Sequence, residues 1–80
     1  MNNIDLDLKD SFLRMDLKAI RKSKGLSQKE LSELSGLSVD TICNMENGDR
    51  SFTIKSLLKY LNALGYDIFI KKENRGDTDD

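Results

Sequence analysis

The sequence contains no histidine and a single cysteine, Cys43. It therefore lacks the residues for a zinc site or for a disulfide framework within the chain. Catalysis has little support either, because there is no histidine base, no nucleophile elbow and no glycine loop that would cradle a phosphate. We predict that the protein is not an enzyme and that it needs no cofactor.

Long apolar runs are also absent. No hydrophobic stretch approaches the roughly 18 residues of a membrane span, and nothing resembles a signal peptide. We therefore expect a cytoplasmic protein with no membrane partner. Its 80 residues make one domain near the lower size at which a single core is stable, and many chains of this size gain burial by dimerising.

A net positive charge is also absent, since the formal net charge is -1, whereas proteins that bind nucleic acid usually carry a basic surface. The charges are, however, unevenly distributed along the chain. Residues 1–16 carry a net charge of -2, residues 17–59 carry +3 and residues 60–80 carry -2. The basic excess lies in the middle of the chain. An interaction with DNA should therefore be of moderate affinity and strongly dependent on salt.

Residues 27–48 read as two short helices joined by a tight turn. Ser27 and Glu30 have the spacing of a capping box, Gly36 is a typical helix end, and Ser38 is a second N-cap. Apolar faces at helical spacing are formed by Leu31 and Leu34 and by Ile42 and Met45. This pattern is typical of a helix-turn-helix, in which the second helix enters a major groove.

Two further helices flank this pair. Leucine and isoleucine at helical spacing predict a first helix from about Asp10 to Gly25 and a last helix between Thr53 and Gly65. We expect Phe52, in the polar loop before the last helix, to anchor that loop to the core.

Residues 17–65 resemble the Cro/cI-type (XRE) helix-turn-helix family of phage and bacterial repressors. The matching marks are Ile20-Arg21, Gly25-Leu26-Ser27-Gln28, Glu30-Leu31, Gly36-Leu37-Ser38, Ile42, Met45-Glu46-Asn47-Gly48, Leu57-Leu58 and Ala63-Leu64-Gly65. Ser32 departs from the family, which usually has alanine there. The resemblance implies an all-α fold, a compact four- to five-helix bundle of lambda-repressor-like DNA-binding type over residues 10–65. It also implies a structural ion pair between Arg21 and Glu46.

Five residues of the third helix project away from its apolar face and match the base-facing positions of the family: Ser38, Val39, Asp40, Cys43 and Asn44. Asn44 has the amide for a bidentate contact to adenine, and Val39 suits a thymine methyl group. Asp40 either excludes wrong bases or only stabilises the N-terminus of its helix. We expect Cys43 to be a bystander.

The predicted contacts to DNA phosphates are Gln28, Thr41, Asn47, Arg50 and Lys55. Gln28 opens the second helix, where backbone amides and the helix dipole attract an anion, and the family uses a glutamine there in this way. Asn47 and Arg50 follow the third helix and are placed for a second phosphate. Thr41 and Lys55 are weaker candidates. For each of them the alternative is simple solvation.

The two ends of the chain are harder to interpret. Residues 1–9 alternate apolar and acidic side chains, and we favour an N-terminal arm over a strand. Residues 66–72 read as a short C-terminal β-strand that pairs either with a second copy, through Tyr66, Ile68, Phe69 and Ile70, or with the first residues of the chain. We expect residues 73–80 to be a disordered tail.

These features predict a sequence-specific transcriptional regulator whose partner is double-stranded DNA. The preferred hypothesis is an autoregulating repressor that binds a palindromic operator as a homodimer. A helix-turn-helix domain followed by one strand also resembles the DNA-binding antitoxins of type II toxin–antitoxin operons, which implies a toxin partner. The alternative from another class is a protein-interaction module that kept the fold without DNA binding, which the acidic balance and the presence of Asp40 and Cys43 on the reading face would favour.

Overall fold

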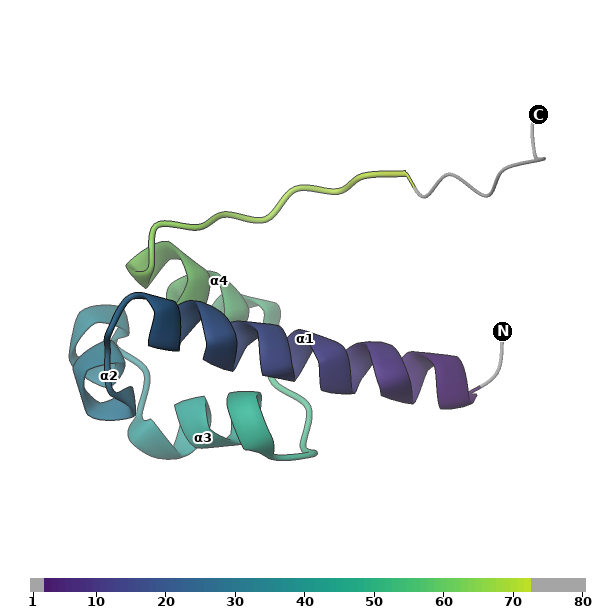
Figure 1. The fold of residues 1–80 in the computed structure, drawn as a ribbon, viewed down its shortest axis with the longest axis horizontal. Helices are drawn as coiled ribbons and strands as arrows, with labels where there is room; N and C mark the ends of the chain where they lie inside the picture. The colour runs from purple at the N-terminus through teal and green to yellow at the C-terminus, as the bar shows by residue number, and fades with distance from the viewer. Residues whose placement is uncertain (1–2, 73–80) are drawn as a thin grey trace.

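The computed structural model describes residues 3–72, which fold into four α-helices with no β-strand among them (Figure 1). The helices are α1 (Asn3–Ser23), α2 (Gln28–Ser35), α3 (Val39–Asn47) and α4 (Ile54–Ala63). Helix α1 runs across the molecule, with α3 along one side of it and α4 along another (Figure 1). The predicted all-α bundle is confirmed, with four helices.

Hydroxyl side chains set the start of each of the three shorter helices. Ser27, Ser38 and Thr53 lie in extended conformations and accept hydrogen bonds from backbone amides in the first turn of α2, α3 and α4. At α2 the capping box is complete, because the Glu30 carboxylate also accepts from the Ser27 amide at 2.8 Å. The predicted starts of α2, α3 and α4 are therefore confirmed.

The core lies where the inward faces of the four helices meet. It consists of Leu17, Leu31, Leu37, Ile42, Met45, Tyr60, Leu61 and Leu64, with Ile20, Leu26, Phe52, Leu57 and Ala63 packed against it. Phe52 is half-buried there, so the loop between α3 and α4 is anchored to the core as the sequence predicted. This core fixes α3 against α1 and leaves the opposite face of α3 exposed.

The predicted N-terminal arm over residues 1–9 is wrong from residue 3 onwards, because α1 begins at Asn3. Alternation of apolar and acidic residues suggested an extended arm, but Ile4 and Leu8 are also four residues apart, a helical spacing. Asp5 in the first turn favours the helix through its dipole. As a result the N-terminal half of α1 projects beyond the other helices (Figure 1).

The predicted C-terminal strand is not found in the part of the chain that the structure describes. After Gly65, with φ 86°, residues 66–72 continue beyond α4 as an extended segment without a ladder of hydrogen bonds (Figure 1). Its start is held by hydrogen bonds from the Tyr66 amide to the Leu61 carbonyl, at 2.8 Å, and from the Asn62 side chain to the Tyr66 carbonyl, at 2.7 Å. An extended segment becomes a strand only when a second segment pairs with it. The tail predicted at residues 73–80 lies outside the described residues.

Candidate nucleic-acid interface

Helices α2 and α3 are joined by a tight turn at Gly36, which has φ 80°, a conformation that glycine adopts without strain. The Ser32 hydroxyl donates a hydrogen bond to the Leu37 carbonyl at 2.5 Å and so ties α2 to this turn. Ile42 and Met45 are fully buried on the inner face of α3. The fold therefore holds α3 rigidly by one face and presents the other to solvent.

A buried ion pair joins α1 to the end of α3. Arg21 donates two hydrogen bonds to the Glu46 carboxylate, from Nε at 2.7 Å and from Nη2 at 2.9 Å, and a third to the Leu26 carbonyl at 2.6 Å. The Tyr60 hydroxyl lies 2.6 Å from Glu46 Oε2 and 2.8 Å from the Leu17 carbonyl. Its single proton goes to one acceptor at a time, and the carboxylate is the stronger one.

The charges of this network are balanced. Burial alone would raise the pKa of Glu46, but hydrogen bonds from Arg21, Tyr60 and Gln28 outweigh it and lower that pKa. The same hydrogen bond from Arg21 to Glu46 raises the pKa of Arg21, while burial and the adjacent carboxylate raise the pKa of Tyr60. Glu46 is therefore ionised at neutral pH, and the pair holds α3 in register with α1.

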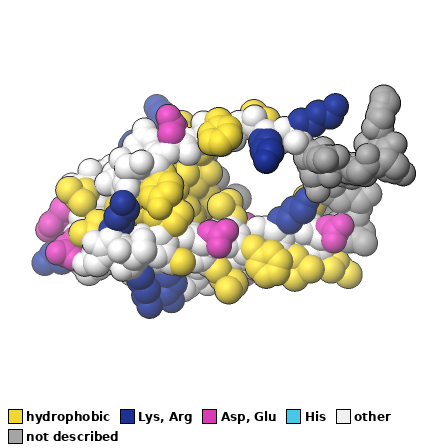
Figure 2. Space-filling model, turned by 45° about the horizontal axis from the view of Figure 1, so that its top comes forward, with side chains coloured by type: hydrophobic (Ala, Val, Ile, Leu, Met, Phe, Trp, Pro, Cys, Tyr) yellow, Lys and Arg dark blue, Asp and Glu magenta, His cyan; other side chains and the backbone are white. Residues whose placement is uncertain are grey.

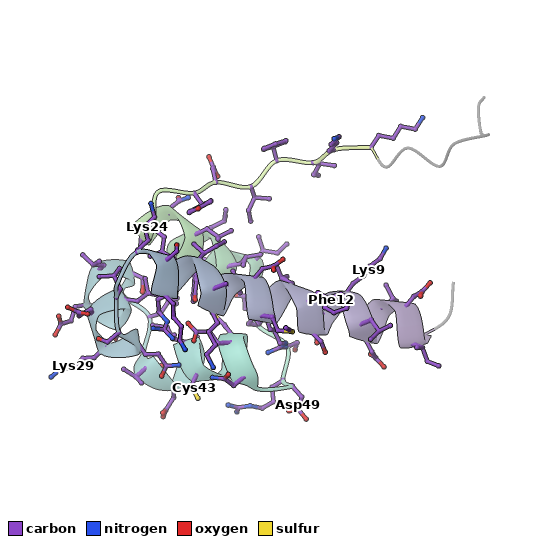
Figure 3. All side chains as sticks on the ribbon, in the orientation of Figure 1. Lys9, Phe12, Lys24, Lys29, Cys43 and Asp49 are labelled. Atoms are coloured by element: carbon purple, nitrogen blue, oxygen red, sulfur yellow. The ribbon has the colours of Figure 1, made fainter. Side chains whose placement is uncertain are left out.

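The predicted base-reading residues lie on the exposed face of α3 or at its N-cap. Some of their side chains are exposed, Ser38 caps the helix, and Asn44 is bonded to the loop. Val39 is 41% exposed, and Asp40 and Cys43 are exposed beside it. The Cys43 side chain points away from α1 (Figure 3). The Ser38 hydroxyl caps α3 by accepting a hydrogen bond from the Thr41 amide, so this hydroxyl is already engaged. Val39, Asp40 and Cys43 thus remain the candidate base-reading residues.

The adenine contact predicted for Asn44 is not supported, because both ends of its amide are already bonded. Asn44 Nδ2 donates to the Arg50 carbonyl at 3.0 Å, and the Arg50 amide donates to Asn44 Oδ1 at 3.2 Å. Asn44 thus makes with the backbone the kind of two-bond contact that we had expected with a base. It holds the loop that follows α3. Gly48 is required beside it, since a Cβ there would collide with Asn44 Oδ1.

Arg14, which the sequence did not single out, supports the same loop from α1. Its guanidinium is buried and donates to the carbonyls of Asn44 and, at 2.7 Å, of Arg50. It also lies 5.0 Å from the centre of the Phe52 ring and pairs with Asp10 at 3.1 Å. The backbone of Arg50 is therefore fixed from two helices, while its side chain is exposed.

The predicted phosphate contacts surround α3. Gln28 Nε2 donates to Glu46 Oε1 at 3.2 Å, so the buried pair orients this side chain at the N-terminus of α2. Asn47 Oδ1 accepts from Lys18 at 3.2 Å, which leaves the Asn47 amide group as a donor. The Thr41 hydroxyl accepts from Ser38 at 2.9 Å. Arg50 and Lys55 are exposed cations on the loop and on the first turn of α4.

Two shallow depressions adjoin the exposed face of α3. One, of about 350 Å³, is lined by α3 and by residues 48–50, and the second, of about 470 Å³, lies between α3 and residues 50–56. Asp40, Asn44 and Arg50 line both. The ridge between them therefore combines candidate base-reading and phosphate-binding residues on one surface.

No group of histidine, cysteine or acidic residues that could hold a metal is found within residues 3–72. Among the same residues, no helix is long and apolar enough to cross a membrane.

Helices α2 and α3, joined by the tight turn at Gly36 with the outer face of α3 exposed, form a helix-turn-helix. The chain matches the helix-turn-helix family over residues 17–70, and it therefore belongs to this family, as the resemblance to the Cro/cI-type regulators indicated. Comparison with curated proteins found no match. The family is one of DNA-binding regulatory domains.

Proposed function

We propose that the protein is a sequence-specific repressor that binds a palindromic operator as a homodimer and regulates its own gene in the cytoplasm. The observation that carries this proposal is the exposed face of α3. Val39, Asp40 and Cys43 face solvent on a helix whose other face is fixed by buried Ile42 and Met45. Rigid presentation of a few side chains to base edges is what direct readout in the major groove requires.

The phosphate contacts follow from the same geometry. Gln28 and the N-terminus of α2 would hold one phosphate, while Thr41, Asn47, Arg50 and Lys55 would hold others beside α3. Because Arg14 and Asn44 fix the backbone of Arg50, the loop need not be ordered when the Arg50 side chain binds a phosphate. These contacts position the protein and carry no sequence information themselves.

The proposal is tested by a fluorescence-anisotropy titration with the DNA upstream of the protein's own gene, at two salt concentrations and with scrambled competitor. We expect binding that resists the competitor and weakens steeply with salt, because bound phosphates release counterions. Asp40→Asn should change the preferred sequence, whereas Lys29→Ala, on the outer side of α2 (Figure 3), should not. Absence of binding even at low salt would contradict the proposal.

A second candidate function is a protein-interaction module or an antitoxin that binds a toxin. Exposed apolar side chains on the C-terminal segment favour it, since Phe69 is 84% exposed and Ile70 97% exposed. Tyr66, Ile68, Phe69 and Ile70 would then contact a partner chain, or a second copy as we predicted. A pull-down with the product of the neighbouring gene tests the antitoxin, because Phe69→Glu would abolish the capture of a toxin and leave DNA binding unchanged. The interaction module, in contrast, would bind no DNA at any salt concentration.

A further inference from the structure

Helix α1 carries two apolar faces on different sides. The inner one includes Leu13, Leu17 and Ile20, of which Leu17 belongs to the core and Ile20 packs against it. The second face, here called the outer stripe, consists of Ile4, Leu8, Phe12, Met15 and Ala19. With 3.6 residues per turn these five positions fall within an arc of about 80°. Such a stripe on a helix normally packs against another element.

The outer stripe has no cover within residues 3–72. Ile4 is 68% exposed, Phe12 56% and Met15 63%. Leu8 and Ala19 are also exposed. Figure 2 shows hydrophobic side chains in a row along the projecting part of α1, and Figure 3 shows Phe12 on this part. The stripe is about 22 Å long at the helical rise of 1.5 Å per residue. It is thus a surface for an elongated apolar partner.

We propose that the partner is the outer stripe of a second copy of this chain, packed antiparallel. The charges beside the stripe make it complementary to itself. One edge carries Asp7 in the first half of α1 and Lys18 in the second half, and the other edge carries Lys9 and Asp16 in the same way. A second copy therefore offers an opposite charge for each of these four. This inference deepens the proposed function, because it rests on the homodimer proposed there.

The antiparallel direction is favoured by the helix dipoles and by the position of α3. Antiparallel helices place each positive N-terminus beside a negative C-terminus, whereas parallel helices place like ends together. Where two antiparallel helices pack face to face, a two-fold axis lies between them. The same edge of each helix then lies on the same side of the pair. The edge of α1 with Arg14 and Lys18 faces α3, since these residues bond to Asn44 and Asn47. Both copies of α3 would therefore lie on one side of the dimer, as a palindromic DNA site requires.

The register of the pair follows from packing. The two stripes interdigitate when Leu8 of one copy lies opposite the gap between Met15 and Ala19 of the other. In this register Asp7 meets Lys18 of the second copy on one edge, and Lys9 meets Asp16 of the second copy on the other edge. Two-fold symmetry doubles both contacts, so four ion pairs surround the apolar seam.

One helix pair is a small interface, below the roughly 800 Å² per partner of standard stable complexes. The dimer should therefore dissociate at low protein concentration, which sedimentation equilibrium without DNA measures directly. We expect Phe12→Glu to yield monomers and Phe69→Glu, on the C-terminal segment, to leave the dimer intact. Both side chains are exposed, and a retained cooperative thermal transition would show that each variant still folds. A dimer that survives Phe12→Glu but dissociates with Phe69→Glu would overturn the proposal.

A charge exchange tests the antiparallel register. Lys9→Asp places aspartate against Asp16 twice in a homodimer, and Asp16→Lys places lysine against Lys9 twice. Each variant alone should dimerise roughly tenfold more weakly, but their mixture should form heterodimers with two restored ion pairs. Residues 9 and 16 are two turns apart in one helix, so a contact within the monomer would not explain this rescue. Equal weakness of the mixture would refute the register, and none of these measurements depends on DNA binding.

Discussion

At the scale of single residues, Arg14 makes several contacts that could not be predicted from the sequence. One buried guanidinium bonds to two carbonyls and to Asp10 and lies over Phe52. We predict that Arg14→Met destabilises the fold by about 2–3 kcal/mol, because it leaves buried carbonyls without a charged donor. Urea unfolding followed by circular dichroism measures this loss. Lys29→Met is the matched control, since Lys29 is exposed, and a loss as large in that variant would contradict the role of Arg14.

Glu46 makes stability depend on acid in a defined direction. Its pKa in the folded protein lies below the ordinary 4.5, so on acidification the unfolded chain takes up the proton first. The stabilisation from this carboxylate is complete above about pH 4.5 and is lost as the pH falls through the lower pKa of the folded state.

We predict that the urea midpoint of the wild-type protein drops between pH 5 and pH 3 and that Glu46→Gln is less stable at neutral pH but less sensitive to acid. The variant leaves Arg21 buried without its carboxylate, which accounts for the neutral-pH loss. Glu30, whose pKa is also lowered through its hydrogen bonds with Ser27, leaves some acid sensitivity in both proteins. Glu33→Gln, on the exposed side of α2, should behave as wild type, and identical acid profiles for all three would refute the role of Glu46.

At the scale of elements, the end of α3 and its following loop act as one unit. The φ of Gly48 is -89°, which any residue can adopt, so backbone strain does not require a glycine there. The close approach of Asn44 explains the glycine, because it leaves no room for a Cβ. We predict that Gly48→Ala displaces the Asn44 amide and weakens binding to operator and scrambled DNA alike, because the loop with Arg50 shifts as a whole. Asn44→Ala should have the same non-selective effect. A loss confined to the operator would show instead that Asn44 reads a base.

The coupling between these two positions is measurable in a double-mutant cycle. In the Asn44→Ala background, Gly48→Ala should cost less stability than in the wild type, since the colliding side chain is gone. Part of the cost should persist, because the Cα and the carbonyl oxygen of Asn44 also lie 3.0 Å from the position that a Cβ would take at residue 48. Strictly additive losses would contradict the coupling.

Local signals account for what the sequence predicted correctly. The caps at Ser27, Ser38 and Thr53 and the glycine at position 36 act within a few residues, so their chemistry is visible in the sequence. The N-terminus of α1 was missed because its residues suit both a period of two and a helical period. The hydrogen bonds from Arg14 to the carbonyls of Asn44 and Arg50 join residues that are 30 and 36 positions apart. A local sequence pattern cannot predict such contacts. The prediction of a C-terminal strand was wrong because a strand forms only when a second segment pairs with it.

At the scale of the whole molecule, the separation of charge along the chain matters more than its sum. The basic middle carries the candidate DNA contacts, while the ends are acidic. Residues 73–80 contain four acidic residues and one arginine, so their deletion changes the formal net charge from -1 to +2. These charges repel DNA whatever path the segment follows, and the repulsion is screened by salt within a Debye length of about 10 Å at 0.1 M.

We predict that deletion of residues 73–80 strengthens binding to scrambled DNA by roughly two- to threefold at 20 mM salt, because it removes three net negative charges that repel phosphates. At 300 mM salt the difference should vanish, because screening removes long-range repulsion and leaves direct contacts. Asp79→Asn with Asp80→Asn, which keeps the length and removes two charges, should give most of the gain. An equal gain at both salt concentrations would mean that the segment blocks the DNA site by contact, and the charge argument would then fail.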